Sequence, residues 1–78
     1  MPHIVVKWFK GRTEQQKQEF ADEIVKKAVE LTGRGAEHFS VAIEEYDPQE
    51  WEEKVYNPEI VDKLDTVYKK PGYGSLAE

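Results

Sequence analysis

Two short stretches of the sequence alternate apolar residues with other residues in the two-residue period of a β-strand. In residues 1–9 one face is wholly apolar, with Ile4, Val6 and Trp8. In residues 39–44 the apolar face carries Phe39, Val41 and Ile43, and Asp47-Pro48 follows as the end of the strand. The opposite face of the first stretch is mixed, so we expect both of its faces to be at least partly covered.

The residues between these stretches repeat with the period of an amphipathic helix. Thr13 followed by Gln16 is a capping box, which predicts that the helix begins at about Glu14. Gly33 predicts its end. The stripe that we expect to be buried consists of Phe20, Ala21, Ile24, Val25, Ala28, Val29 and Leu31.

After the second strand the pattern becomes less regular. Residues 48–56 predict a short helical turn or loop that carries Trp51. Asn57 as a cap and Pro58 at the first helical position predict the start of a second helix. Its expected buried stripe is Ile60, Val61, Leu64, Val67 and Tyr68, and Pro71-Gly72-Tyr73-Gly74 is expected to end it.

This order of elements predicts an α/β protein (α+β in some schemes) with a β-α-β-α unit in one domain, residues 1–78. About thirty residues with one helix separate the strands, which is the length of a β-α-β unit with parallel strands. A parallel sheet needs both faces covered, and two strands alone are marginal. We therefore expect subunits to associate, with their sheets joined or stacked.

Composition narrows the functional classes. The 78 residues contain no cysteine, which excludes disulfides and thiolate metal sites, and the two histidines are far apart, so no metal site is expected. The net charge of −5 argues against a nucleic-acid partner. The longest apolar run, residues 4–6, is far too short for a signal peptide or membrane span. No membrane role is expected, and the cytoplasm is the expected compartment.

Pro2 is the candidate for chemistry. If Met1 is removed, Pro2 carries a free secondary amine, which can act as a base and a nucleophile. The pKa of an ordinary chain amine is about 7.7–8.0, and an apolar pocket or a neighbouring cation lowers it. A proline also suits the first residue of a strand simply because it has no N–H to place in the ladder. The position alone leaves both interpretations open.

The chain resembles the 4-oxalocrotonate tautomerase family over nearly its whole length. The residues that carry the resemblance are Pro2 at the start of a short strand, the turn Gly11-Arg12-Thr13-Glu14-Gln15-Gln16-Lys17, and a β-α-β unit of this length. The stretch Asp47-Pro48-Gln49-Glu50-Trp51 and the ending Lys69-Lys70-Pro71-Gly72-Tyr73 resemble the para-phenylpyruvate tautomerase branch.

The resemblance implies assembly as dimers or hexamers, no cofactor, and Pro2 as the general base. It implies that Arg12 binds a substrate carboxylate and lowers the pKa of Pro2 if the two are near. It implies that Trp51 forms an apolar wall. The second arginine of the founding enzyme falls on Ser40, whose hydroxyl is a candidate substrate ligand. Losing that cation points to a monocarboxylate or to another binding mode.

Each of these residues also has a structural interpretation. Arg12 is equally explained as a solvated turn residue, Trp51 as an anchor onto the core, and Ser40 as a strand serine that faces solvent. With the family included, we expect a cofactor-free tautomerase of 2-hydroxyalkenoates such as phenylenolpyruvate, working as a homodimer in preference to a hexamer. The alternatives are another proline-dependent activity (hydratase, dehalogenase or decarboxylase) and a non-catalytic assembly or protein-binding module.

Overall fold

The computed structural model describes residues 1–77. The chain divides into two compact units, and the boundary between them in the sequence lies between Tyr46 and Asp47. The prediction of a single domain over residues 1–78 stays a prediction. Within residues 1–77, none of the helices combines the length and the apolar character that crossing a membrane requires.

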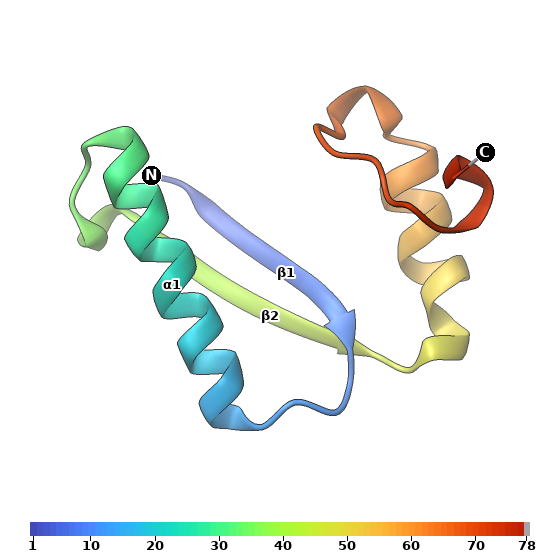
Figure 1. Cartoon of the computed structure of the whole chain (residues 1–78), viewed down its shortest axis with the longest axis horizontal. Helices are drawn as coiled ribbons and strands as arrows, with labels where there is room; N and C mark the ends of the chain where they lie inside the picture. Colours follow the sequence, from blue (N-terminus) through green and yellow to red (C-terminus); the bar gives the residue numbers. More distant parts are fainter. Residues whose placement is uncertain (78) are drawn as a thin grey trace. The chain divides into compact units, whose positions relative to one another are not determined.

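The first unit is a β-α-β unit, in which β1 (His3–Phe9) is followed by α1 (Glu14–Thr32), a short turn η1 (Ala36–His38) and β2 (Ser40–Tyr46). The two strands form a parallel sheet, with His3 opposite Ser40 at one end and Phe9 opposite Tyr46 at the other. Helix α1 runs alongside the sheet (Figure 1). The predicted fold class, the parallel pairing and the end of β2 before Asp47 are confirmed.

The alternation in the sequence decides which face of the sheet meets α1. Trp8 packs on Phe20 of α1, with ring centroids 4.8 Å apart and the rings tilted. Ile4 and Val6 share that face of β1, because side chains two residues apart point the same way. On the opposite face, Val5 and Phe9 remain 43% and 42% exposed, so the first unit by itself leaves this side of the sheet partly uncovered.

The caps of α1 lie where the sequence places them. The Thr13 hydroxyl accepts the Gln16 N–H at 3.1 Å, and the Gln16 side chain accepts the Thr13 N–H at 2.9 Å. This reciprocal capping box satisfies two N–H groups that the first turn cannot satisfy itself. Gly33 ends the helix at φ 75°, a left-handed conformation, and donates its N–H to the Val29 carbonyl at 3.0 Å.

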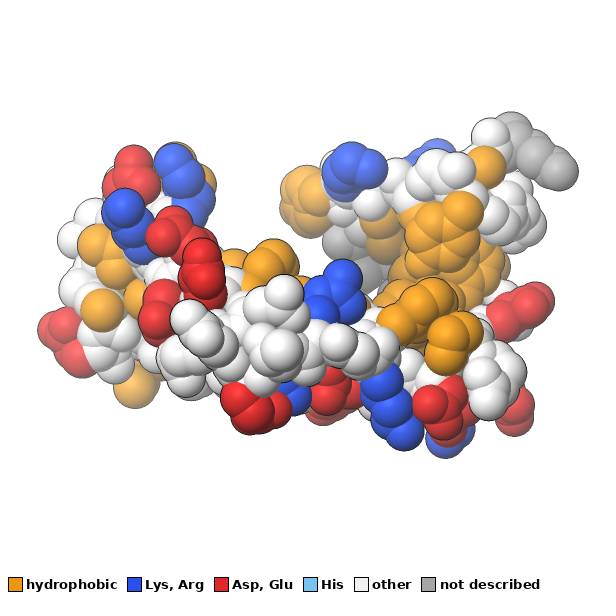
Figure 2. Space-filling view, turned by 60° about the horizontal axis from the view of Figure 1, so that its bottom comes forward, with side chains coloured by type: hydrophobic (Ala, Val, Ile, Leu, Met, Phe, Trp, Pro, Cys, Tyr) orange, Lys and Arg blue, Asp and Glu red, His pale blue; other side chains and the backbone are white. Residues whose placement is uncertain are grey.

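The predicted buried stripe of α1 is partly wrong. Phe20 is 43% and Leu31 is 79% exposed, and no residue of the helix is fully buried. The physical reason is width, because two strands offer a surface too narrow to cover a helix of nineteen residues. Figure 2 shows apolar side chains reaching the surface in several patches among the charged ones.

The second unit begins earlier in its helical part than the sequence predicts. Asp47 accepts the backbone N–H of Glu50 and donates its own N–H to the Glu50 carboxylate at 3.0 Å, which is a capping box with Pro48 at the first position. The elements that follow are η2 (Pro48–Glu50), the π-helix η3 (Glu52–Val61), and the short turns η4 (Leu64–Thr66) and η5 (Gly74–Ala77).

The predicted helix start at Asn57-Pro58 is therefore wrong. Pro58 lies inside η3, where the Asn57 carbonyl accepts the N–H of Asp62 at 2.9 Å, the five-residue spacing of a π-helix. The cap at Asp47 had already started the helical segment, so the later cap signal was not needed. The end of the predicted second helix is also wrong, since η3 stops at Val61 and Tyr68 is fully exposed.

The core of the second unit consists of Val55 and Tyr56, and the half-exposed Tyr73 packs on Tyr56. Val55 and Tyr56 are 4% and 5% exposed, the most deeply buried apolar residues that the structure describes. The Tyr56 hydroxyl donates to the Tyr73 carbonyl at 3.2 Å, and the two rings are 5.4 Å apart. A Cβ at Gly74 would come within 2.5 Å of the Tyr56 hydroxyl, so only glycine fits at this position.

Candidate active site

Pro2 lies at the amino end of β1 beside a pocket. Its carbonyl accepts the N–H of Ser40 at 3.2 Å, the first bond of the parallel ladder, and its ring is exposed. The pocket has a volume of about 480 Å³, which is within the range of small-molecule sites. Its lining residues are Met1, Pro2, Thr32, Arg34, His38 and Phe39. Met1 is attached here, so the Pro2 nitrogen in this form is a peptide nitrogen with no basic lone pair.

Ser40 is a second candidate residue that the fold of the first unit brings to Pro2. This proximity follows from the strand register, since Ser40 pairs with His3 and donates its N–H to the Pro2 carbonyl. The Ser40 hydroxyl lies 2.6 Å from Nδ1 of His3 and is exposed. Which group donates depends on the tautomer of His3: when Nδ1 carries the proton, the Ser40 hydroxyl accepts it and its own O–H can donate to a ligand.

Arg12 lies at the other end of the sheet. Strand β1, seven residues long, separates it from Pro2, and at about 3.3 Å per residue the two are more than ~20 Å apart. That is beyond the Debye length of about 8 Å at physiological salt. Within one chain Arg12 therefore neither binds the same small substrate as Pro2 nor influences the Pro2 amine.

The surroundings of Arg12 also give it a structural role. Its guanidinium donates to the Phe9 carbonyl at 3.3 Å and lies 4.2 Å from the centroid of the Trp8 ring. A cation above an aromatic face at this distance is attracted by the ring quadrupole. These contacts close the turn between β1 and α1.

Trp51 belongs to the second unit. It lies between η2 and η3, is half-buried, and donates its indole N–H to the Tyr73 hydroxyl at 3.0 Å. The structure therefore places Trp51 in a helical segment and holds its ring against the C-terminal part of the chain. Its predicted role as a wall for substrate stays a prediction.

Sequence reasoning missed the segment between α1 and β2. Thr32, Arg34, His38 and Phe39 all line the pocket beside Pro2. The signal was available, because in a parallel β-α-β unit the chain leaving the helix returns to the edge where the first strand began. Within residues 1–77, the Arg34 guanidinium makes no ion pair or hydrogen bond, and Arg34 contributes only its backbone N–H, donated to the Thr32 hydroxyl at 3.2 Å.

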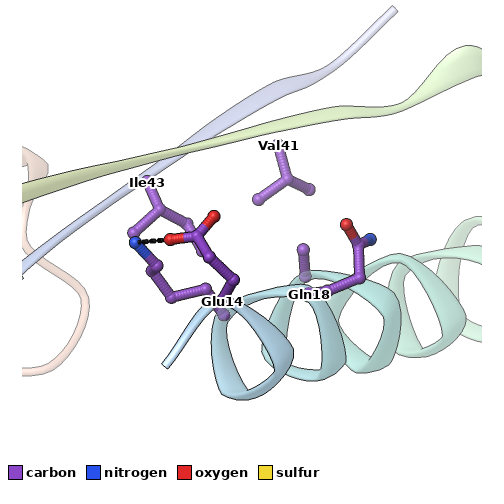
Figure 3. A pocket seen from close by; sticks show the side chains of 6 residues that line it. Glu14, Gln18, Val41 and Ile43 are labelled. Carbon is purple, nitrogen blue, oxygen red and sulfur yellow. Dashed lines mark ion pairs between the residues drawn. The ribbon is translucent and has the colours of Figure 1, made fainter. Parts of the chain in front are cut away.

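The carboxyl end of the sheet carries an ion-pair network instead. Lys17 pairs with Glu14 and, at 3.1 Å, with Glu45 of β2. The hydrogen bonds that the Lys17 ammonium donates to these carboxylates, first the one to Glu14, raise the pKa of Lys17 above its ordinary value of 10.5. A hollow of about 270 Å³ between α1 and β2 lies here, lined in part by Gln18, Val41 and Ile43 (Figure 3).

Among residues 1–77, no three His, Asp or Glu side chains are gathered in a way that could hold a metal ion. Two buried polar atoms of the described residues have no hydrogen-bond partner, the indole nitrogen of Trp8 and one carboxylate oxygen of Glu45. Both lie towards the carboxyl end of the sheet, away from Pro2.

The chain matches the family described as "Tautomerase enzyme" over residues 2–52, and it belongs to this family. The expectation of an enzyme, an isomerase of the tautomerase type, is confirmed.

Curated relatives extend the match beyond residue 52. A protein of Xylella fastidiosa named "Probable tautomerase" is 40% identical over 99% of this chain and 94% of its own length. A protein of Cronobacter sakazakii named "Tautomerase PptA" is 39% identical over 94% of this chain and 97% of its own. These matches confirm the predicted resemblance to the 4-oxalocrotonate tautomerase family and its para-phenylpyruvate tautomerase branch.

Solved structures agree on the fold. TomN, described as a 4-oxalocrotonate tautomerase homologue in the tomaymycin biosynthetic pathway, superposes with a TM-score of 0.62 at 30% identity, over 64% of this chain and 77% of its own. YwhB, described as a homologue of 4-oxalocrotonate tautomerase, superposes with a TM-score of 0.56 at 35% identity, over 59% of this chain and 75% of its own.

Proposed function

We propose that the protein is a cofactor-free tautomerase that converts the enol form of a 2-oxo acid, such as phenylenolpyruvate, into the keto form, with the amine of Pro2 as general base once Met1 is removed. The observation that carries this proposal is the position of Pro2 at the entrance of β1, in the lining of a pocket whose other residues apart from Met1 stay in place when Met1 is removed. Membership of the tautomerase family supports the reaction class.

The chemistry needs one group that both accepts and returns a proton. The neutral Pro2 nitrogen takes the proton of the enol hydroxyl, and the carbonyl forms as the electrons of the carbon–carbon double bond shift towards C3. The resulting ammonium then delivers its proton to C3. Such positioned proton transfer contributes typically about 10²–10⁴-fold to the rate.

The site is completed, in this proposal, by a second copy of the chain. Arg12 is held at the opposite end of its own sheet, so an Arg12 that contacts substrate at Pro2 comes from another subunit. The uncovered face of the sheet, with Val5 and Phe9 exposed, supports association. We propose a homodimer in which Arg12 binds the substrate, Trp51 provides an apolar wall, and the Ser40 hydroxyl contributes a hydrogen bond. Light scattering that gives a stable monomer would contradict this assembly, and a hexamer would change only its size.

The test is the rate of phenylenolpyruvate ketonisation by protein whose intact mass confirms loss of Met1. We expect Pro2→Ala to lower kcat by at least about 10²-fold, because the primary amine of alanine replaces the secondary amine that the proline ring holds in place. Pro58→Ala is the matched control, since Pro58 lies inside η3 and has no amine to lose, and its rate should equal that of the wild type.

Three results would contradict the proposal. The first is native protein that retains Met1, and the second is a Pro2→Ala variant with the full rate. The third is a wild type that hydrates an unsaturated haloacid but does not ketonise phenylenolpyruvate. That third result would keep Pro2 as the functional group and change the reaction.

A further inference from the structure

We propose that Arg34 is a substrate-binding residue that acts within the same chain as Pro2, by pairing with the carboxylate of a monocarboxylate substrate. This inference takes the identity of the reaction from the proposed function. The binding of a carboxylate by Arg34 can nevertheless be measured without the reaction. It assigns a role to the segment between α1 and β2, which the sequence interpretation did not use.

The fold brings Arg34 to Pro2 by a short and well-defined path. Gly33 ends α1 with φ 75°, and this left-handed residue turns the chain away from the helix axis immediately before Arg34. Six residues later the Ser40 N–H bonds to the Pro2 carbonyl, so the far end of this connection is fixed at the entrance of β1. Arg34 and Pro2 accordingly line one pocket.

The positive charge of Arg34 is also available to a ligand. Among the residues that the structure describes, its guanidinium is not committed to a carboxylate, whereas the Arg12 guanidinium lies over Trp8 and donates to the Phe9 carbonyl. A planar guanidinium matches a carboxylate with two parallel hydrogen bonds, which fix the orientation of the substrate as well as its position. His38 faces the same pocket, and its Nε2 lies 3.7 Å from a carboxylate oxygen of Glu37.

The other lining groups indicate the rest of the substrate. Phe39 is half-buried and, with the Pro2 ring, gives the pocket an apolar side, and the Thr32 hydroxyl adds a neutral polar group. Arg34 is the only lining residue of this pocket with a permanent positive charge. A substrate with one carboxylate and an apolar or aromatic remainder fits these groups, and a second carboxylate would have no partner among them.

The first test is binding without turnover. Calorimetric titration of the demethionylated protein with 2-fluoro-p-hydroxycinnamate should give a Kd that rises about 10- to 100-fold in Arg34→Ala, the loss expected for a hydrogen-bonded charge pair. Arg34→Lys should recover only part of the affinity, because it keeps the charge and loses the planar fork. Lys26→Ala removes the same charge from the exposed side of α1 and should leave Kd unchanged.

The second test uses kinetics with a substrate that lacks the charge. For phenylenolpyruvate, Arg34→Ala should raise KM by a similar factor, and for its methyl ester it should change KM by less than about twofold. A merely structural role of Arg34 would affect the acid and the ester alike, and that result would overturn the inference.

The third test asks which chain supplies each residue. When Pro2→Ala and Arg12→Ala subunits are mixed and allowed to exchange, a site with both wild-type residues forms if Arg12 acts between chains, and activity returns. A mixture of Pro2→Ala with Arg34→Ala should regain nothing, because no site then has both wild-type Pro2 and wild-type Arg34. Recovery in this mixture would overturn the assignment to the same chain. An inactive Pro2→Ala with an unchanged Kd for Arg34→Ala would refute this inference alone, and a fully active Pro2→Ala would refute only the proposed base.

Discussion

The two ends of the sheet in the first unit differ in how their charges are used. At the carboxyl end, Arg12 and Lys17 are both committed to partners of their own chain, namely the Phe9 carbonyl and Trp8 ring for Arg12 and two glutamates for Lys17. At the amino end, Arg34 lines a pocket beside Pro2 and its guanidinium has no such partner within residues 1–77.

This difference separates the residues that stabilise the first unit from the residues that are available to bind a ligand. Groups that hold elements together have their hydrogen-bonding capacity used, and groups that bind a ligand must have some left. The carboxyl end should therefore respond to mutation mainly through stability, and the amino end mainly through ligand binding. Six substitutions test this contrast by their effect on the stability of the folded chain.

The largest expected effect is that of Trp8→Ala at the carboxyl end. It removes the packing on Phe20 and the surface that Arg12 covers, and we expect a loss of about 3 kcal/mol, the low end for such truncations because the site is only half-buried. Leu31→Ala, at the other end of the unit and 79% exposed, should cost less than about 0.5 kcal/mol. Urea denaturation measures both. Equal costs would remove the contrast between the two ends.

The next effect compares two threonines at opposite ends of α1. Thr13→Ala deletes the cap and should cost about 1 kcal/mol. Thr32→Ala loses exposed contacts with the Ala28 carbonyl and the Arg34 N–H, and the better helix propensity of alanine partly offsets this, so we expect a change of a few tenths of a kcal/mol. Thermal unfolding followed by circular dichroism measures the pair, and a larger loss for Thr32→Ala would reverse the expectation.

A smaller effect, dependent on pH, is expected for Lys17→Met. The pKa of Lys17 is raised in the folded chain above its ordinary value of 10.5. The contribution of Lys17 to the free energy of unfolding is therefore fully present below pH 10.5, and it is lost as the pH rises through the pKa of the folded state. The difference in unfolding midpoint between wild type and Lys17→Met should therefore be constant near neutral pH and shrink above pH 10.5. A difference that grows with pH would contradict the assignment of the pKa shift.

The smallest effect is expected for Ser40→Ala at the amino end. Its hydroxyl contacts His3 in an exposed position, so its loss should change the free energy of unfolding by less than about 0.5 kcal/mol. Any loss of activity in this variant would then report on the pocket itself. A loss of several kcal/mol would mean that the amino end is as structurally committed as the carboxyl end.

Local signals predicted the first unit well. The alternation of Ile4, Val6 and Trp8 identified the face of β1 that meets α1, and the caps at Thr13 and Gly33 placed the helix to the residue. These features depend on contacts within a few residues or on a period, and both are visible in a sequence.

What the sequence did not predict depends on competition or on context. Two cap signals, at Asp47 and at Asn57, competed for the start of one helical segment, and the earlier one with its complete capping box prevailed. The exposure of Phe20 and Leu31 depends on how much surface faces the helix, which no window of residues encodes. Arg34 was missed because its place beside Pro2 is created by chain reversal rather than by a motif.

The bond from the Ser40 N–H to the Pro2 carbonyl has a consequence for maturation. It is the first bond between the two strands and begins one residue after Met1, which is 99% exposed. An aminopeptidase can therefore cut the Met1–Pro2 bond of the already folded chain without breaking a rung of the sheet. Excision and folding need not follow a fixed order in the cell.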